Sequence, residues 1–152
     1  MKLVENIPVD THTIEDLIKD KNDLFLVWPS ANYPFDHGQW QVVLNPDEGN
    51  MSFFIYDDHE LIGHAALRRT EIQGMYAVCY LYLLPDIRSR GLGARMMTLL
   101  EDYAREKLSA RQLVLKTRTY NPRAVRCYEK AGFMEFNRDG TLIVMSKMLK
   151  PG

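Results

Sequence analysis

A short stretch in the middle of the chain combines two arginines and two glycines directly after an apolar run. Arg88, Arg90, Gly91 and Gly93 follow the segment LYLLP, and the residues after them have the spacing of an amphipathic helix. The first turn of a helix has backbone N–H groups without intrahelical partners and a partial positive charge, so it attracts anions. Glycines lack a Cβ that would keep an anion away, and arginines add charged donors. This junction therefore predicts a phosphate-binding site.

Two common phosphate-binding loops do not fit these residues. A dinucleotide-binding fingerprint needs a third glycine where Met96 stands, and a Walker loop needs Gly-Lys followed by Ser or Thr. The pattern that remains is R-x-x-G-x-G after an apolar strand. In the alternative interpretation, the glycines only form a turn and the arginines are solvated.

A second group of polar residues lies downstream, in the segment LVLKTRTYNPRAVRCYEKAGF. Asn121 precedes Pro122, which favours a helix that starts here, and Tyr128 follows on about the same side of that helix. One ligand could therefore touch both side chains. Capping alone could explain Asn121, and Tyr128 could be a packed aromatic residue with a satisfied hydroxyl.

Together, the two segments resemble the GNAT superfamily of N-acetyltransferases over about Leu61 to Phe133. The first segment is similar to the acetyl-CoA loop of that family. The second is similar to the family segment in which an asparagine, a helical tyrosine and a closing Gly-Phe recur. The resemblance implies acetyl-CoA as cosubstrate and an amine acceptor, either a small molecule or a peptide or protein. Ser89 departs from the family pattern, which often has glycine directly after the arginine.

The resemblance also implies roles for individual residues. Tyr128 is implied to be the general acid toward the leaving CoA sulfur, and a tyrosine with a pKa of about 10 is protonated at neutral pH. Asn121 is implied to hydrogen-bond the pantetheine arm, whose amides pair with the main chain of Leu83 and Leu84. The implied cofactor-binding residues are Leu83, Leu84, Arg88, Ser89, Arg90, Gly91, Leu92, Gly93, Ala94 and Asn121.

The family resemblance implies direct attack of the amine on the thioester, without a covalent enzyme intermediate. Cys79 and Cys127 have no neighbouring histidine, so neither is expected to act as a nucleophile. The attacking amine must be neutral, and candidates for the base are Tyr80, Tyr82 and His64, with packing as the alternative role of each. A non-catalytic CoA-binding regulatory module is the alternative to an enzyme.

Other polar clusters are expected to be structural or solvated. No metal site is expected, because His12, His37 and His59 lack metal-ligand spacing along the chain. A basic cluster around the second motif either helps to neutralise the CoA phosphates or forms a solvated helix face. Its members are Arg118, Arg123, Arg126 and Lys130.

The elements that must position these residues mix strands and helices. A strand is expected near Lys2 to Asn6, followed by a helix that Thr11 or Thr13 caps and that ends near Asp20. Segment 23–40 combines prolines, a glycine and aromatic residues, which indicates a lid or an irregular loop pinned to the core by its rings. The further elements are strands Ser52 to Tyr56, Leu61 to Arg69 and Ala77 to Leu84, helix Gly91 to Lys107, strand Gln112 to Thr117, helix Pro122 to Ala131, and closing strands Phe133 to Phe136 and Leu142 to Ser146.

This order predicts an α/β (α+β) fold with a mixed, mostly antiparallel central sheet flanked by helices, and the resemblance implies the same GNAT-like architecture. Ala77 to Leu84 is nearly continuously apolar, as a central strand covered on both faces would be. Nothing marks a second domain, so residues 1–152 are expected to form one acetyl-CoA-dependent N-acetyltransferase domain.

Composition and charge argue against several other classes of protein. The chain has 19 basic and 20 acidic residues, so its charge gives no global reason to bind nucleic acid or an anionic membrane. It has no long apolar run and no signal-peptide pattern, which favours a cytoplasmic location. Cys79 and Cys127 are expected to be free, buried thiols. The oligomeric state stays open, a homodimer included.

Overall fold

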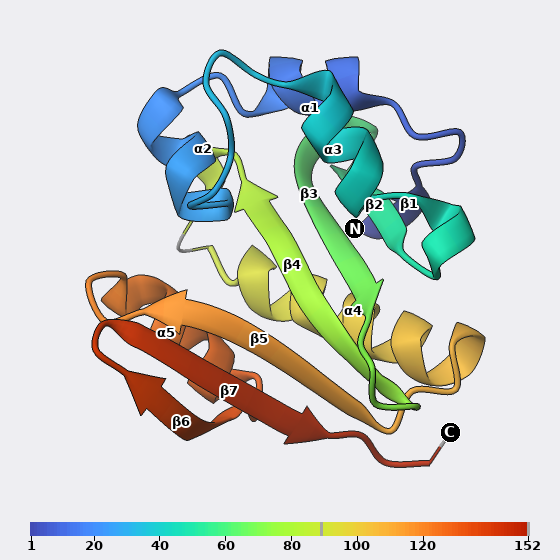
Figure 1. Ribbon diagram of the computed structural model, residues 1–152, viewed down its shortest axis with the longest axis vertical. Coiled ribbons are helices and arrows are strands. Elements are labelled where there is room, and N and C mark those ends of the chain that lie inside the picture. The colour runs from blue at the N-terminus through green and yellow to red at the C-terminus, as the bar shows by residue number, and fades with distance from the viewer. Residues whose placement is uncertain (89, 152) are drawn as a thin grey trace. The chain divides into compact units, whose positions relative to one another are not determined.

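The structure is a computed structural model that describes residues 1–88 and 90–151. Ser89 and Gly152 lie outside the described residues. Figure 1 shows the helices and strands, which follow one another as β1 (Lys2–Glu5), α1 (Thr11–Leu17), α2 (Lys21–Val27), α3 (His37–Val43), η1 (Pro46–Glu48), β2 (Met51–Asp57), β3 (Glu60–Arg69), β4 (Met75–Leu83), η2 (Pro85–Ile87), α4 (Leu92–Lys107), β5 (Gln112–Arg118), α5 (Pro122–Lys130), β6 (Met134–Asp139) and β7 (Leu142–Met148).

The strands of the described chain form a seven-stranded sheet with the order β1-β2-β3-β4-β5-β7-β6. Pairing is antiparallel between β1 and β2, β2 and β3, β5 and β7, and β6 and β7. β4 and β5 are parallel, and the chain joins them through α4, because a parallel pair needs a crossover connection. The predicted mixed, mostly antiparallel fold is therefore confirmed.

The chain divides into two compact units, and β4 contributes residues to both. The first unit comprises Met1–Arg68 and Cys79–Ile87, and the second comprises Arg69–Val78 and Arg88–Gly152. The first unit therefore holds α1 to α3, whereas the second holds the helices α4 and α5. A single domain over residues 1–152 stays a prediction.

The first helix has a different cap from the one predicted. Asp10, rather than Thr11 or Thr13, is its N-cap, and the Asp10 carboxylate accepts hydrogen bonds from the backbone N–H of Thr13 at 3.0 Å and from its hydroxyl at 2.7 Å. A carboxylate suits this position because it also faces the positive end of the helix dipole. α1 ends at Leu17, before the predicted end, and Asp20 caps α2 instead.

The aromatic segment 23–40, predicted as a lid or as an irregular loop pinned to the core, is helical at both ends. α2 and α3 take up its two ends, and Pro29 and Pro34 lie between them. The fully buried Trp40 ring lies edge-on to Trp28 at 5.1 Å and stacks with Phe35 at 5.4 Å, measured between ring centroids. The aromatic rings therefore pin this segment to the core of the first unit, which agrees with the predicted alternative of a segment pinned by its rings.

The strand predictions are confirmed with shifted ends, except for the burial of β4. β4 is central in the strand order, and its buried side chains alternate at Val78, Tyr80 and Tyr82. The residues between them are only partly buried, so the strand is not completely covered on both faces. Within the described residues, neither Cys79 nor Cys127 forms a disulfide bond, and both side chains are partly buried. No helix in the described part of the chain is both long and apolar enough to cross a membrane.

In the second unit, one lysine joins both helices to the sheet. Lys147 on β7 donates hydrogen bonds from Nζ to both carboxylate oxygens of Glu101 on α4, at 2.9 and 3.0 Å. The same Nζ donates to the carbonyl oxygen of Ala131, the C-cap of α5, at 2.7 Å. Charge-assisted hydrogen bonds of this kind are stronger than neutral ones, and here they fix α4 and the end of α5 against β7.

A buried polar chain runs from the end of β1 to β4 in the first unit. His64 is fully buried, with Nδ1 2.9 Å from the carbonyl oxygen of Tyr80 and Nε2 2.7 Å from Ser52 Oγ. A carbonyl can only accept a hydrogen bond, so Nδ1 carries the proton and Nε2 accepts from the Ser52 hydroxyl. Ser52 Oγ in turn accepts from Asn6 Nδ2 at 3.2 Å. Every polar atom of the His64 ring is thus satisfied.

His64 supports a strained residue in the central strand. Tyr80 has a φ of +54°, a left-handed backbone conformation that is unfavourable for a bulky residue. The hydrogen bond from His64 Nδ1 reaches the carbonyl of this same residue. Burial lowers the pKa of His64 to about 4, so the ring is neutral at pH 7 and keeps the acceptor that Ser52 needs.

The stability of the chain is expected to depend on the protonation of His64. The unfolded chain binds a proton at this histidine near pH 6.5, whereas the folded chain binds it only near pH 4. The free energy of unfolding should therefore fall by about 3 kcal/mol as the pH drops from 7 to 4, in addition to the effects of other groups. Urea unfolding at a series of pH values measures this slope.

The variant His64→Asn should flatten the slope, whatever its effect on stability at pH 7. The matched control is His59→Asn at an exposed turn, which should leave the slope unchanged. Equal slopes in all three proteins would show that His64 does not bear the pH dependence.

Candidate functional site

The predicted phosphate loop leads into an uncapped helix start. Gly91 is the N-cap of α4, with a φ of +77°, and no side chain caps the helix. The first intrahelical hydrogen bond runs from the backbone N–H of Arg95 to the carbonyl of Gly91. In residues 1–88 and 90–151, nothing accepts a hydrogen bond from the amides of Leu92, Gly93 or Ala94. These groups are available to an anion.

Within the protein itself, the two glycines are needed for different reasons, and their predicted role in the approach of an anion stays a prediction. A Cβ on Gly91 would meet nothing within 4 Å, but its positive φ disfavours any L side chain. A Cβ on Gly93 would lie 3.1 Å from Cys127 Sγ, which is closer than ordinary van der Waals contact. Gly93 therefore lets α4 approach α5.

For the other predicted cofactor-binding residues, the structure gives the burial or the backbone contacts. Arg88 is partly buried and Arg90 is exposed, while Ser89 lies outside the described residues. Leu83 ends β4 in the first unit. The next residue, Leu84, donates its N–H to the carbonyl of Ile62 at 2.9 Å. The Leu84 N–H is therefore not available to pair with a pantetheine arm.

Asn121 stands at the helix start where it was predicted, but its side chain does not cap the helix. It is the N-cap residue of α5, with Pro122 at the first helical position, and no capping hydrogen bond comes from its side chain. Proline lacks an N–H, so this helix start has one donor fewer to satisfy. Helix capping therefore does not explain why an asparagine stands here, and its side-chain amide is available to a ligand.

Tyr128 combines a packed ring with an unengaged hydroxyl. Its ring packs edge-on against Phe133, with 6.3 Å between centroids. Its Oη makes no hydrogen bond within the part of the chain that the structure describes. Desolvation by the surrounding protein raises the pKa of Tyr128 well above its usual value, and the neighbouring Cys127 adds to this. The phenol thus stays protonated at neutral and moderately alkaline pH.

The contact between α4 and α5 brings the two predicted motifs together. Gly93 in the first turn of α4 lies against Cys127, which immediately precedes Tyr128 on α5. The first turn of α4 and the turn of α5 that bears Cys127 and Tyr128 therefore lie against each other in the second unit, although they come from separate segments. In the basic cluster, Arg123, Arg126 and Lys130 are exposed, which is compatible with both predicted roles, a solvated helix face or help in neutralising the CoA phosphates.

The three candidate bases are all engaged elsewhere in the first unit. Both ring nitrogens of His64 have partners, as described above. Burial raises the pKa of Tyr80 to about 12, and Arg68 donates to its hydroxyl at 3.3 Å. Tyr82 donates its hydroxyl to Asp23 Oδ2 at 3.3 Å. These contacts favour the packing roles and leave none of the three suited to take a proton from an amine.

Two features of the first unit could not have been predicted from the sequence. The carboxylate of Asp23 reaches Tyr82 only because α2 packs near β4 in the first unit. The left-handed backbone of Tyr80 is equally hidden, since a tyrosine in an apolar run predicts an ordinary strand. Hydrophobic periodicity reports burial and does not report such local departures.

Comparison with known proteins places the chain among acetyltransferases. The sequence profile of the acetyltransferase (GNAT) family matches residues 13–133. The fold is similar to that of spermidine N-acetyltransferase from Vibrio cholerae in complex with CoA and spermine, with a TM-score of 0.77 and 20% identity over 97% of this chain and 94% of that chain. It is also similar to Campylobacter jejuni N-acetyltransferase PseH in complex with acetyl coenzyme A, with a TM-score of 0.73 and 19% identity over 98% of this chain and 99% of that chain.

At such low identity, the two structures support the fold, whereas the profile match covers most of the chain and identifies the family. The matched residues include α4 with its uncapped start and α5 with Tyr128. From this match we conclude that the chain belongs to the acetyltransferase (GNAT) family and is an acetyl-CoA-dependent N-acetyltransferase.

Proposed function

We propose that the chain transfers the acetyl group of acetyl-CoA directly to a primary amine, with Tyr128 as the general acid. The observation that carries this proposal is the meeting of the α4 start with the α5 turn that bears Tyr128. The amides of Leu92, Gly93 and Ala94 would hold the CoA diphosphate, as helix starts do for other phosphates. The side-chain amide of Asn121 would hydrogen-bond the pantetheine arm.

Tyr128 would act on the sulfur atom as the thioester breaks. The amine nitrogen attacks the carbonyl carbon, the C–S bond breaks, and the leaving thiolate accepts a hydrogen bond or a proton from Tyr128 Oη. The amine releases one proton as the amide forms, and solvent returns a proton to the phenol. A thiol has a pKa of about 8.5, below that of this tyrosine, so stabilisation by the hydrogen bond should contribute more than complete proton transfer.

The first unit offers a group that suits a cationic acceptor. Asp23 is a partly exposed carboxylate, and its Oδ2 accepts a hydrogen bond from the buried Tyr82. The rings of Trp28 and Tyr80 lie beside each other, with 5.1 Å between centroids. Carboxylates and aromatic faces both attract ammonium groups. We therefore propose a small amine with a second cationic group, such as a polyamine, as the acceptor.

The variant Tyr128→Phe should lose activity while still binding acetyl-CoA. Removing the hydroxyl should lower kcat by about 10² or more, since general acids contribute this much, and the ring that packs on Phe133 stays in place. Release of CoA thiol with a panel of amines measures kcat, and calorimetry measures CoA affinity. Tyr76→Phe, at a partly buried tyrosine elsewhere on the second unit, is the matched control.

Wild-type activity should rise with pH as the amine loses its proton, without a decline from Tyr128 below about pH 10. A wild-type chain that binds CoA but releases thiol with no amine would instead be a non-catalytic CoA-binding module. Tighter binding of ATP than of CoA would point to a nucleotide-binding protein.

The variant Asn121→Ala separates ligand binding from helix capping. Loss of one hydrogen bond to the pantetheine arm should weaken acetyl-CoA binding by about two- to tenfold. The melting temperature of the ligand-free chain should hardly change, because this side chain makes no capping bond. A clear fall in the melting temperature with unchanged CoA affinity would assign Asn121 a structural role.

The variant Asp23→Asn tests whether Asp23 attracts the second cationic group of the amine substrate. It keeps an acceptor for the Tyr82 hydroxyl but removes the charge, so KM for a diamine should rise by about tenfold while KM for acetyl-CoA stays the same. A monoamine of similar length should be less affected, because its single amino group reacts in the neutral form. Equal changes for both amines would place the cation site elsewhere.

A further inference from the structure

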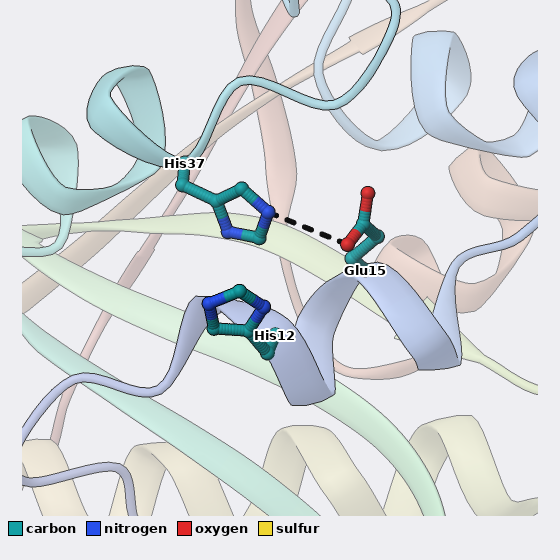
Figure 2. A group of neighbouring side chains, drawn as sticks. All are labelled: His12, Glu15 and His37. Carbon is teal, nitrogen blue, oxygen red and sulfur yellow. Dashed lines mark ion pairs between the residues drawn. The ribbon is translucent and has the colours of Figure 1, made fainter.

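Three potential metal ligands gather between α1 and α3 in the first unit. Figure 2 shows the His12 and His37 rings facing each other, with the Glu15 carboxylate directed toward His37. His12 and Glu15 lie three residues apart on α1, a spacing that puts both on one helix face. His37 is the first residue of α3. One ligand atom from each of the three lies within 4.8 Å of the other two.

The spacing of Glu15 and His37 already fits two ligands of one zinc ion. Glu15 Oε1 and His37 Nε2 are 3.3 Å apart. Zinc binds imidazole nitrogen and carboxylate oxygen at about 2.0–2.2 Å in tetrahedral geometry, which places neighbouring ligand atoms about 3.4 Å from each other. The exposed His12 ring is 4.2 Å from the His37 ring between centroids, so a small rotation can bring in the third ligand.

The second nitrogen of His37 has the partner that a metal-binding histidine requires. His37 Nδ1 lies 2.7 Å from Thr11 Oγ1, and Thr11 is almost completely buried. When this hydroxyl accepts from Nδ1–H, Nε2 presents its lone pair toward the space beside Glu15. Such an outer hydrogen bond fixes the tautomer and orientation of zinc-binding histidines. Phe35 further confines the ring, edge-on at 4.9 Å between centroids.

Both ligand-bearing helices are fixed at their starts by carboxylates. Asp10 accepts the N–H of Thr13 at 3.0 Å, and Asp36 accepts the N–H of Gln39 at 3.1 Å. These caps hold the first turns from which His12 and His37 project. Their negative charges also offset the partial positive charge of the helix starts, which would otherwise oppose a cation.

We propose that His12, Glu15 and His37 bind one zinc ion, with water in the fourth position, and that the ion joins α1 to α3. Two imidazoles and one carboxylate favour zinc over magnesium or calcium, which prefer oxygen ligands alone. The ion would lie between His37 Nε2 and the Glu15 carboxylate, which are 3.3 Å apart. The sequence predicts no metal because these ligands have no regular spacing along the chain. The fold supplies their proximity, and the proposal does not depend on acetyl transfer.

Competition titration of the tag-free chain with Zn²⁺ against a chromophoric chelator tests the proposal. We expect one equivalent of zinc per wild-type chain. His12→Asn and Glu15→Gln should each weaken binding by at least about tenfold, and Thr11→Val should weaken it by a similar factor through the orientation of His37. His59→Asn, at an exposed histidine outside the cluster, should bind as the wild type does.

Two further measurements locate the ion. Zinc should shift the ¹⁵N resonance of His37 Nε2 and leave both nitrogens of the buried His64 unchanged. Cobalt(II) should give a visible spectrum of nitrogen and oxygen ligands, without the charge-transfer band of a bound thiolate. The proposal is overturned if zinc binds the His12→Asn and Glu15→Gln variants as tightly as the wild type. It is equally overturned if a thiolate band shows that Cys79 or Cys127 holds the metal.

Discussion

The first turn of α4 leaves main-chain amides without partners, and the chemistry of the second unit depends on this. Gly91 caps the helix with a left-handed backbone and offers no side chain to the amides that follow. Such groups need water or a ligand, because an unmade hydrogen bond costs free energy. A diphosphate meets that need with negative charge as well as acceptor oxygens. The parallel pair of β4 and β5 requires a crossover connection, so the same topology that builds the sheet also produces the helix start that we propose binds the diphosphate.

Rigid supports on both units hold side chains that would otherwise sample several positions. In the second unit, Lys147 bonds to Glu101 and to the end of α5, so the helices that carry the α4 amides and Tyr128 are held by one cation. In the first unit, His64 performs the corresponding task for the strained backbone of Tyr80. Each support uses a polar group whose hydrogen bonds are made within the protein, which is how buried polar groups are tolerated.

The sequence predicted the helices of the second unit better than those of the first. α4 and α5 were predicted because apolar residues recur at helical spacing and a glycine or a proline marks where each helix begins. The motifs that these helices carry also resemble those of a known family. The two short helices at the ends of segment 23–40 were not predicted, because the prolines between them indicate irregular structure. These helices are stabilised by the packing of aromatic rings around Trp40. The contact between His37 and His12 could not be predicted either, because the spacing of residues along the sequence does not show which distant segments meet in the fold.

The packing of Gly93 against Cys127 ties two positions of the sequence to each other. A Cβ on residue 93 would lie 3.1 Å from Cys127 Sγ, so Cys127 would have to move by a few tenths of an ångström, or be replaced by a smaller residue, if residue 93 gained a side chain. Among homologues, these two sites should vary as a pair, with bulk exchanged between them and their summed volume nearly constant. In laboratory evolution, a larger residue at position 127 would push on Gly93 and so move the helix start that we propose binds the acetyl donor.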